Sequence, residues 1–164
     1  MLGRAEWRAT DLSRFPRLGW AIVTCMDSRV DTTELFGGIG HGDAHVIRNA
    51  GGVVTDDTIR SLAISQRLGR TSGIFLVHHT DCALATVTDQ EFADQLARET
   101  GSRPSWRAES FTDLDGSVRR SMEKVEASPF VPRKHAVRGF VYDVVTGDLH
   151  EVRRRPVVPV SHGR

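Results

Sequence analysis

Short continuous apolar runs alternate with helical patterns along most of this 164-residue chain. Apolar runs of this length are typical of strands buried on both faces of a sheet, whereas amphipathic segments that end at glycine or proline indicate helices. The expected strands are WAIVTCM (20–26), AHVIRNAGG (44–52) and SGIFLVHHTDC (72–82), and the expected helices are TDDTIRSLAISQRLG (55–69), DQEFADQLARET (89–100) and SVRRSMEKVEASPF (117–130). This alternation predicts an α/β fold with a mainly parallel β-sheet flanked by helices.

The last patterned segment, VRGFVYDVVTGDLHEV (137–152), contains two alternating runs around Thr146-Gly147-Asp148, which predicts a β-hairpin. No internal repeat or linker divides the chain, so we expect a single domain over residues 20–152. We interpret residues 1–19 as an N-terminal arm and residues 153–164 as a flexible C-terminal tail.

The charge balance argues against a polyanionic partner. Lysine and arginine number 22 against 21 aspartates and glutamates, so no field of one sign favours nucleic acid. No run approaches the roughly 20 apolar residues that a membrane-spanning helix needs, and the first residues lack the apolar core of a signal peptide. We therefore expect a cytoplasmic protein with no nucleic-acid or membrane partner. In that compartment, two cysteines are more often reduced, metal-bound or catalytic than paired.

Reactive side chains gather at the ends of two expected strands. Cys25, Asp27 and Arg29 follow the first apolar run, while His79 and Cys82 close the third in an H-x-x-C pattern. In open α/β sheets, functional sites form outside the carboxyl ends of the strands. If these two strands are neighbours, the two groups of side chains meet in space.

Two thiolates and one imidazole form a natural ligand set for zinc, and three protein ligands leave a fourth position open for chemistry. The sequence therefore predicts a Zn²⁺ site made by Cys25, His79 and Cys82. Other interpretations stay open at this point. Either cysteine alone is more often a small buried apolar residue, an isolated H-x-x-C pattern also arises by chance, and a disulfide between Cys25 and Cys82 would be unusual in a reducing compartment.

Asp27 and Arg29 have two possible roles beside a metal. The carboxylate can accept a hydrogen bond from hydroxide on zinc, with Arg29 keeping Asp27 ionised and oriented. Alternatively, Asp27 itself ligates zinc in a closed state that opens when Arg29 draws the carboxylate away. The sequence permits both states. Among the other histidines, His78 is expected to point away from His79, and His41 and His45 are interpreted as surface or packing residues.

Three motifs in this order, CMDSR (25–29), GDAHVIRNAGG (42–52) and HHTDC (78–82), resemble those of the beta-class carbonic anhydrases, especially small bacterial members. The resemblance covers about Trp20 to Val152. It implies a mainly parallel α/β fold, zinc held by Cys25, His79 and Cys82, and an Asp27–Arg29 dyad in which Asp27 can replace water as fourth ligand. It also implies reversible hydration of carbon dioxide to bicarbonate and a proton, in a homodimer or tetramer.

Three departures accompany this resemblance, and one of them is His78, which stands where the family frequently has glycine. Ala83 stands where the family commonly has glycine, which is expected to constrain the turn after Cys82, and the segment before the first strand is short for the family's N-terminal arm. The alternative functions are hydrolysis of a carbon dioxide analogue such as carbon disulfide, a non-catalytic zinc-stabilised binding domain with Asp27 locked on the metal, and a redox switch formed by Cys25 and Cys82.

Overall fold

The computed structural model describes residues 12–134 and 136–154 of the chain. Most of the expected N-terminal arm and of the expected C-terminal tail (residues 1–11 and 155–164) lie outside this part. Within it, none of the helices combines the length and the apolar character that crossing a membrane would require.

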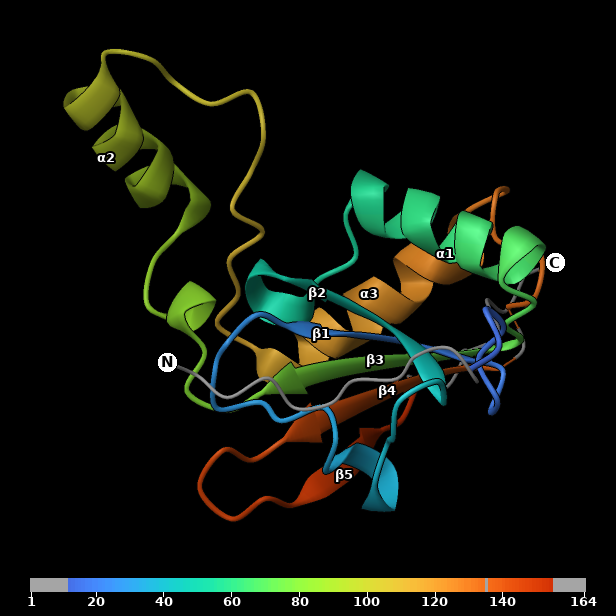
Figure 1. Cartoon of the computed structure of the whole chain (residues 1–164). Coiled ribbons are helices and arrows are strands. Elements are labelled where there is room, and N and C mark those ends of the chain that lie inside the picture. The colour runs from blue at the N-terminus through green and yellow to red at the C-terminus, as the bar shows by residue number, and fades with distance from the viewer. Residues whose placement is uncertain (1–11, 135, 155–164) are drawn as a thin grey trace, which may run out of the picture.

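A single five-stranded sheet forms the centre of the described structure (Figure 1). Its strand order is β2-β1-β3-β4-β5, with four parallel strands and the last one antiparallel. The strands are β1 (Trp20–Cys25), β2 (Ala44–Asn49), β3 (Gly73–His79), β4 (Val137–Tyr142) and β5 (Leu149–Val152), and the helices are α1 (Asp56–Leu68), α2 (Asp89–Thr100) and α3 (Leu114–Ala127). The predicted fold class and the C-terminal hairpin, β4–β5, are therefore confirmed.

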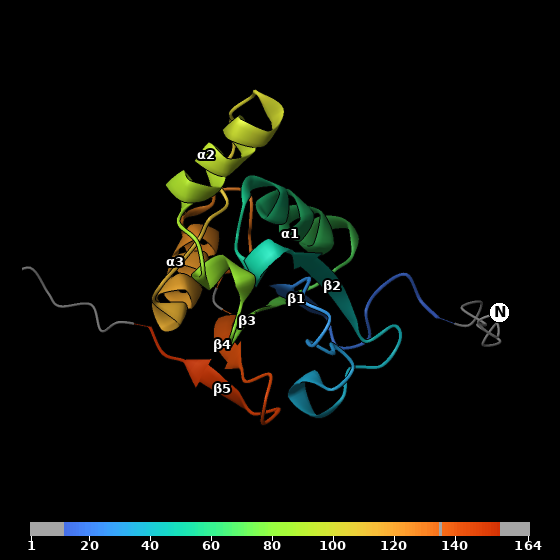
Figure 2. The same ribbon diagram turned by 90° about the vertical axis from the view of Figure 1, so that its left-hand side faces the viewer.

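Helices α1 and α3 cover one face of the sheet (Figures 1 and 2). Leu62 of α1 and Val118 and Met122 of α3 pack there against Val23 and Leu76. The opposite face is covered by the segment between β1 and β2, which buries the side chains of Val30, Leu35 and Ile39. Burial of apolar area on both faces supplies the main stabilisation, at about 25 cal/mol per Å².

The helix boundaries follow from local capping chemistry. The side chain of Thr55 accepts a hydrogen bond from the Thr58 amide and begins α1. Helix α2 ends at Gly101, which adopts a left-handed φ of 74°. Helix α3 begins at Leu114 because the Asp113 side chain caps the Gly116 amide, so the expected start at residue 117 was three residues late.

The segment that carries α2 projects from the body of the molecule (Figure 1), and no residue of α2 is fully buried. Its attachment is polar: Asp89 accepts hydrogen bonds from the amide and hydroxyl of Ser110 and from Nε of Arg107. Phe92 and Trp106 add a ring contact with centroids 6.4 Å apart. The expected helix at 89–100 is thus present and stands largely apart from the core.

The neighbouring strands β1 and β3 define a topological switch point. The chain leaves β1 over one face of the sheet toward β2, and leaves β3 on the helical face toward β4. Open α/β sheets bind ligands in the crevice outside the carboxyl ends of two such strands. Cys25 ends β1 and His79 ends β3, so both residues lie at this position.

Candidate metal centre

The sequence-predicted ligands Cys25, His79 and Cys82 come together in the structure. Their ligand atoms all lie within 4.8 Å of one another, and all three residues are buried. Cys25 and His79 end two strands that are adjacent in the sheet although distant in the chain, and Cys82 lies in the turn after the second strand. The two thiols are free cysteines, and Val53 and Phe111 pack around them as an apolar shell.

Cys25 sits in an environment that favours the thiolate. Its sulfur accepts hydrogen bonds from the backbone amides of Asp27, at 3.4 Å, and Gly51, at 3.3 Å. The contact with the Cys82 thiol, together with His79 and these amides, outweighs burial and lowers the pKa of Cys25 to about 4. The same contact, together with burial, raises the pKa of the Cys82 thiol. A cation between the sulfurs would favour deprotonation of both.

The tautomer of His79 is fixed by its neighbour. Its Nδ1 lies 2.8 Å from the carbonyl oxygen of Thr80, which can only accept, so Nδ1 carries the proton. The lone pair of Nε2 consequently points into the cluster, where this buried atom has no hydrogen-bond partner among the described residues. An imidazole held through its far nitrogen, with the near nitrogen unsatisfied, is the usual state of a histidine prepared for a metal.

The ligand set fits zinc well. Two thiolates and a neutral imidazole match the cysteine and histidine ligands that Zn²⁺ prefers, and three protein ligands are typical of a catalytic rather than a structural site. The orphaned Nε2 atom of His79 supports this assignment, because a buried polar atom without a partner costs free energy unless a ligand satisfies it.

Asp27 is held next to the cluster by Arg29. Its Oδ1 accepts hydrogen bonds from the amide and Nε of Arg29, at 2.9 and 3.0 Å, and its Oδ2 accepts one from Nη2 at 2.8 Å. These bonds lower the pKa of the Asp27 carboxyl well below its usual range, so the group is ionised at neutral pH. Oδ2 also lies 3.9 Å from Nε2 of His79, which brings the carboxylate close to the ligand atoms.

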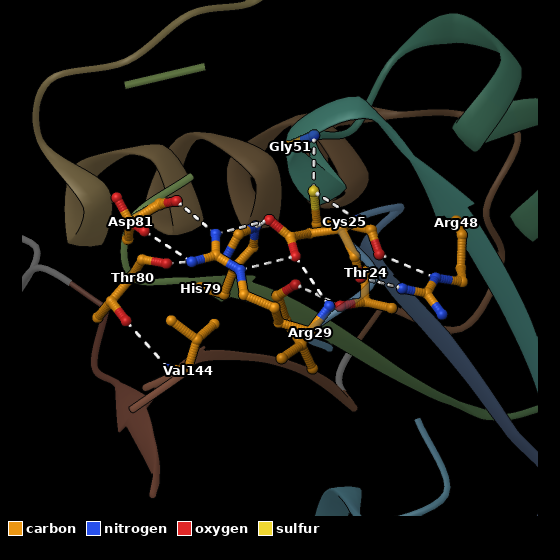
Figure 3. A network of polar contacts seen from close by, with 11 residues as sticks. Thr24, Cys25, Arg29, Arg48, Gly51, His79, Thr80, Asp81 and Val144 are labelled. Carbon is orange, nitrogen blue, oxygen red and sulfur yellow. Dashed lines mark hydrogen bonds and ion pairs between the residues drawn. The ribbon is translucent and has the colours of Figure 1, made fainter. Parts of the chain in front are cut away.

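Two more residues, not singled out from the sequence, shape this site (Figure 3). Arg48, near the end of β2, donates from Nε to the Cys25 carbonyl and from Nη2 to the Asp27 carbonyl, at 2.9 and 2.6 Å. Asp81, in the turn after β3, accepts from Nη1 of Arg29 at 2.6 Å. The contacts of both residues depend on how the chain folds at the carboxyl edge of the sheet.

The other histidines within residues 12–134 and 136–154 lie outside the cluster. His78 is fully buried, its ring is 5.7 Å from that of Phe111, and burial lowers its pKa to about 4, so it is neutral. His45 pairs through Nδ1 with the hydroxyl of Ser65 on α1, which agrees with its interpretation as a packing residue. Ala83 is exposed and begins a short 3₁₀ turn, Ala83–Ala85, so its methyl group occupies solvent-facing space.

A buried cluster of two cysteines and a histidine at the carboxyl edge of a mainly parallel sheet defines an α/β protein with a catalytic-type zinc site. A sequence profile described as carbonic anhydrase matches residues 20–149. The chain therefore belongs to the carbonic anhydrase family, and its relatives place it in the beta class.

Several known proteins are similar to this chain over most of their length. Beta-carbonic anhydrase 1 of Mycobacterium tuberculosis is 55% identical over 132 residues, which cover 80% of each chain. A solved carbonic anhydrase of Streptococcus mutans is 44% identical, with a TM-score of 0.82 over 87% of this chain and 86% of the other. A carbon disulfide hydrolase of Saccharolobus solfataricus is 33% identical, covering 82% of this chain and 77% of its own length. The expected family, enzyme class and zinc cofactor are confirmed.

Proposed function

We propose that this chain catalyses the reversible hydration of carbon dioxide to bicarbonate and a proton, with Cys25, His79 and Cys82 as its zinc ligands. The observation that carries the proposal is the convergence of these three buried ligand atoms within 4.8 Å. Membership of the carbonic anhydrase family supports the reaction, and the unsatisfied Nε2 atom of His79 supports the ligand set.

Zinc, when bound, would act as a Lewis acid and make water a competent nucleophile near neutral pH. The residues around the site orient the attacking water and exclude bulk solvent. Asp27, ionised and fixed by Arg29, accepts a hydrogen bond from the attacking water and so directs a lone pair toward carbon dioxide. The apolar side chains of Val53 and Phe111 suit a small apolar substrate and keep bulk water away from the sulfurs.

The closed state, with Asp27 as the fourth ligand, competes with this arrangement. Three hydrogen bonds from Arg29 occupy both carboxylate oxygens of Asp27. These bonds favour the state in which the carboxylate accepts a hydrogen bond from water and does not ligate the metal. We therefore assign Asp27 and Arg29 as the catalytic dyad of an open site.

The chain acts as a homo-oligomer, a dimer or tetramer, in this proposal. Strand β2 forms an edge of the sheet, and the outer side of α1 borders an apolar groove of about 800 Å³. Leu68 and Phe130 in this groove are 71% and 63% exposed, which is unusual for large apolar side chains unless another chain covers them. A second copy is the occupant we infer. A cytoplasmic location completes the proposal, because a reducing compartment protects the two thiols.

Ligand substitutions test the reaction and the site together. Cys82→Ser and His79→Gln should lose stoichiometric zinc and carbon dioxide hydration measured by stopped flow, because each removes a ligand atom. His45→Gln is the matched control, because the His45 side chain pairs with Ser65 outside the cluster, and this variant should keep both zinc and activity. Unchanged zinc and activity in the ligand variants would refute the site. A wild-type protein that hydrolyses carbon disulfide but does not hydrate carbon dioxide would replace the proposed reaction with the alternative.

A further inference from the structure

The guanidinium group of Arg29 is shared between two aspartates. Nε and Nη2 donate to the carboxylate of Asp27, while Nη1 donates to Oδ2 of Asp81 at 2.6 Å and Nη2 to the Asp81 carbonyl at 2.9 Å. Four contacts thus engage a group that carries five N–H donors in a rigid plane. Arg29 therefore cannot rotate about its last bonds without breaking contacts to both partners.

Asp81 belongs to the turn that carries the metal ligands. It lies between His79 and Cys82, and its φ of 54° is in the left-handed region, which aspartate adopts more readily than most residues. Figure 3 shows Asp81 beside the guanidinium of Arg29. The Asp81 side chain is 75% exposed, so this ion pair contributes little to stability. Its value lies in the geometry that it imposes on Arg29.

We propose that Asp81 is a positioning residue that fixes the Arg29 guanidinium, so that Arg29 keeps the Asp27 carboxylate off the metal. The inference rests on the proposed function of this site. Arg29 and a cation at the Cys25–His79–Cys82 cluster compete for the same oxygens of Asp27, because Oδ2 lies only 3.9 Å from Nε2 of His79. Without the second anchor, Arg29 gains rotational freedom, and Asp27 spends more time as a metal ligand.

The variant Asp81→Asn removes the negative charge with little other change. Asparagine tolerates the left-handed conformation equally well, and the backbone carbonyl that accepts from Arg29 remains. Glu151→Gln is the matched control. Glu151, on strand β5, accepts two hydrogen bonds from Arg138 at 2.8 and 2.7 Å in a similarly exposed pair that is separate from the metal cluster.

Kinetics separate positioning from substrate binding. We expect Asp81→Asn to lower kcat for carbon dioxide hydration about fivefold with KM unchanged, because a smaller fraction of the enzyme is open at any moment. The zinc content of Asp81→Asn should equal that of the wild type, and this equality would show that the variant folds and binds the metal. Glu151→Gln should match the wild type in kcat, KM and zinc content.

A spectroscopic test needs no turnover. In the cobalt-substituted protein, thiocyanate titrates the visible spectrum by taking the open position, and the apparent Kd should rise about fivefold in Asp81→Asn. The same substitution in an Asp27→Asn background should leave this Kd unchanged, because the competing carboxylate is gone.

Two results would overturn the role of Asp81: a thiocyanate Kd in Asp81→Asn equal to that of Glu151→Gln, or an equal rise of Kd in the presence and absence of the Asp27 carboxylate. A wild-type protein that binds cobalt and thiocyanate but hydrates no carbon dioxide would refute the proposed function instead. The titration would still decide the role of Asp81 in that case.

Discussion

The backbone amide of Gly51 donates a hydrogen bond to the sulfur of Cys25 over a distance of 3.3 Å. This contact joins the turn after β2 to the end of β1. The next residue, Gly52, is so close to the sheet that a Cβ atom there would lie 2.9 Å from the Cys25 nitrogen and 2.9 Å from the Val77 carbonyl oxygen. Gly51 and Gly52 therefore allow the turn after β2 to approach Cys25 closely.

Gly52→Ala should destabilise the protein and reduce its zinc content. Gly52 has a φ of 67°, and the backbone atoms that meet the new methyl group cannot move without displacing Cys25. Gly37→Ala is the control, because Gly37 also has a positive φ, 81°, but open space around it, so it should cost only about 1 kcal/mol. Urea unfolding and metal analysis of both variants provide the comparison. Equal losses of stability and zinc in the two variants would argue against close packing on the Cys25 backbone as the reason that position 52 requires glycine.

Asp27→Asn should lower carbon dioxide hydration by about 10- to 100-fold while the protein keeps its zinc. The amide retains the size of the carboxylate but loses the charge that Arg29 holds at two oxygens. Asp31→Asn, at an exposed acid that bonds Thr33, is the control and should retain full activity. Stopped-flow assays with zinc analysis measure both effects. A loss of zinc equal to the loss of rate would instead identify Asp27 as an obligatory ligand.

The hydration rate should rise toward alkaline pH. Two thiolates bring two negative charges to a divalent cation, so less positive field remains to acidify water than with three neutral imidazoles. A pH–rate profile of the wild type from roughly pH 6 to roughly pH 9 measures this effect. A rate that stays constant down to pH 6 would contradict the charge argument.

Acid should loosen the attachment of α2. Partial burial raises the pKa of Asp89, but hydrogen bonds from Ser110 and Arg107 outweigh it, and the net pKa is lowered. A carboxyl whose pKa is lower in the folded state stabilises above its unfolded pKa, about 3.9, and loses that contribution as the pH falls through the folded value. Hydrogen exchange of peptides from 101–111, corrected for intrinsic rates, should therefore accelerate below about pH 4. In Asp89→Asn this acceleration should be absent, and its persistence there would implicate other acids.

Much of this fold follows from local pattern. The buried strands, the threonine and glycine signals around α1 and α2, and the hairpin turn each have a local physical cause that the sequence displays. The late start expected for α3 has a local cause as well, because Asp113 was available as a cap. The placement of both packed helices on one face depends instead on the order of the strands, which no local signal determines.

The convergence of Cys25, His79 and Cys82 was predictable from the sequence, but the geometry of the cluster was not. Side chains two residues apart in a strand lie on the same face of the sheet, so Cys25 is expected on the face of Val23 and His79 on the face of Val77. These are opposite faces, and the two side chains would therefore point away from each other if both strands continued. They meet because both strands end there and the His79–Cys82 turn folds over the edge. The contacts of Arg48 and Asp81 arise from the same edge geometry, which is why residue type and spacing alone did not indicate them.

The two strand ends that supply the sulfurs and the imidazole are far apart in the chain, so an unfolded polypeptide presents only the local His79–Cys82 pair. Affinity for the ion is consequently coupled to formation of the sheet, and by mass action each increment of free ion above its dissociation constant shifts the equilibrium toward the native state. An ion bound by these three side chains would therefore stabilise the pairing of β1 with β3, and the zinc concentration would affect the fraction of protein that is folded.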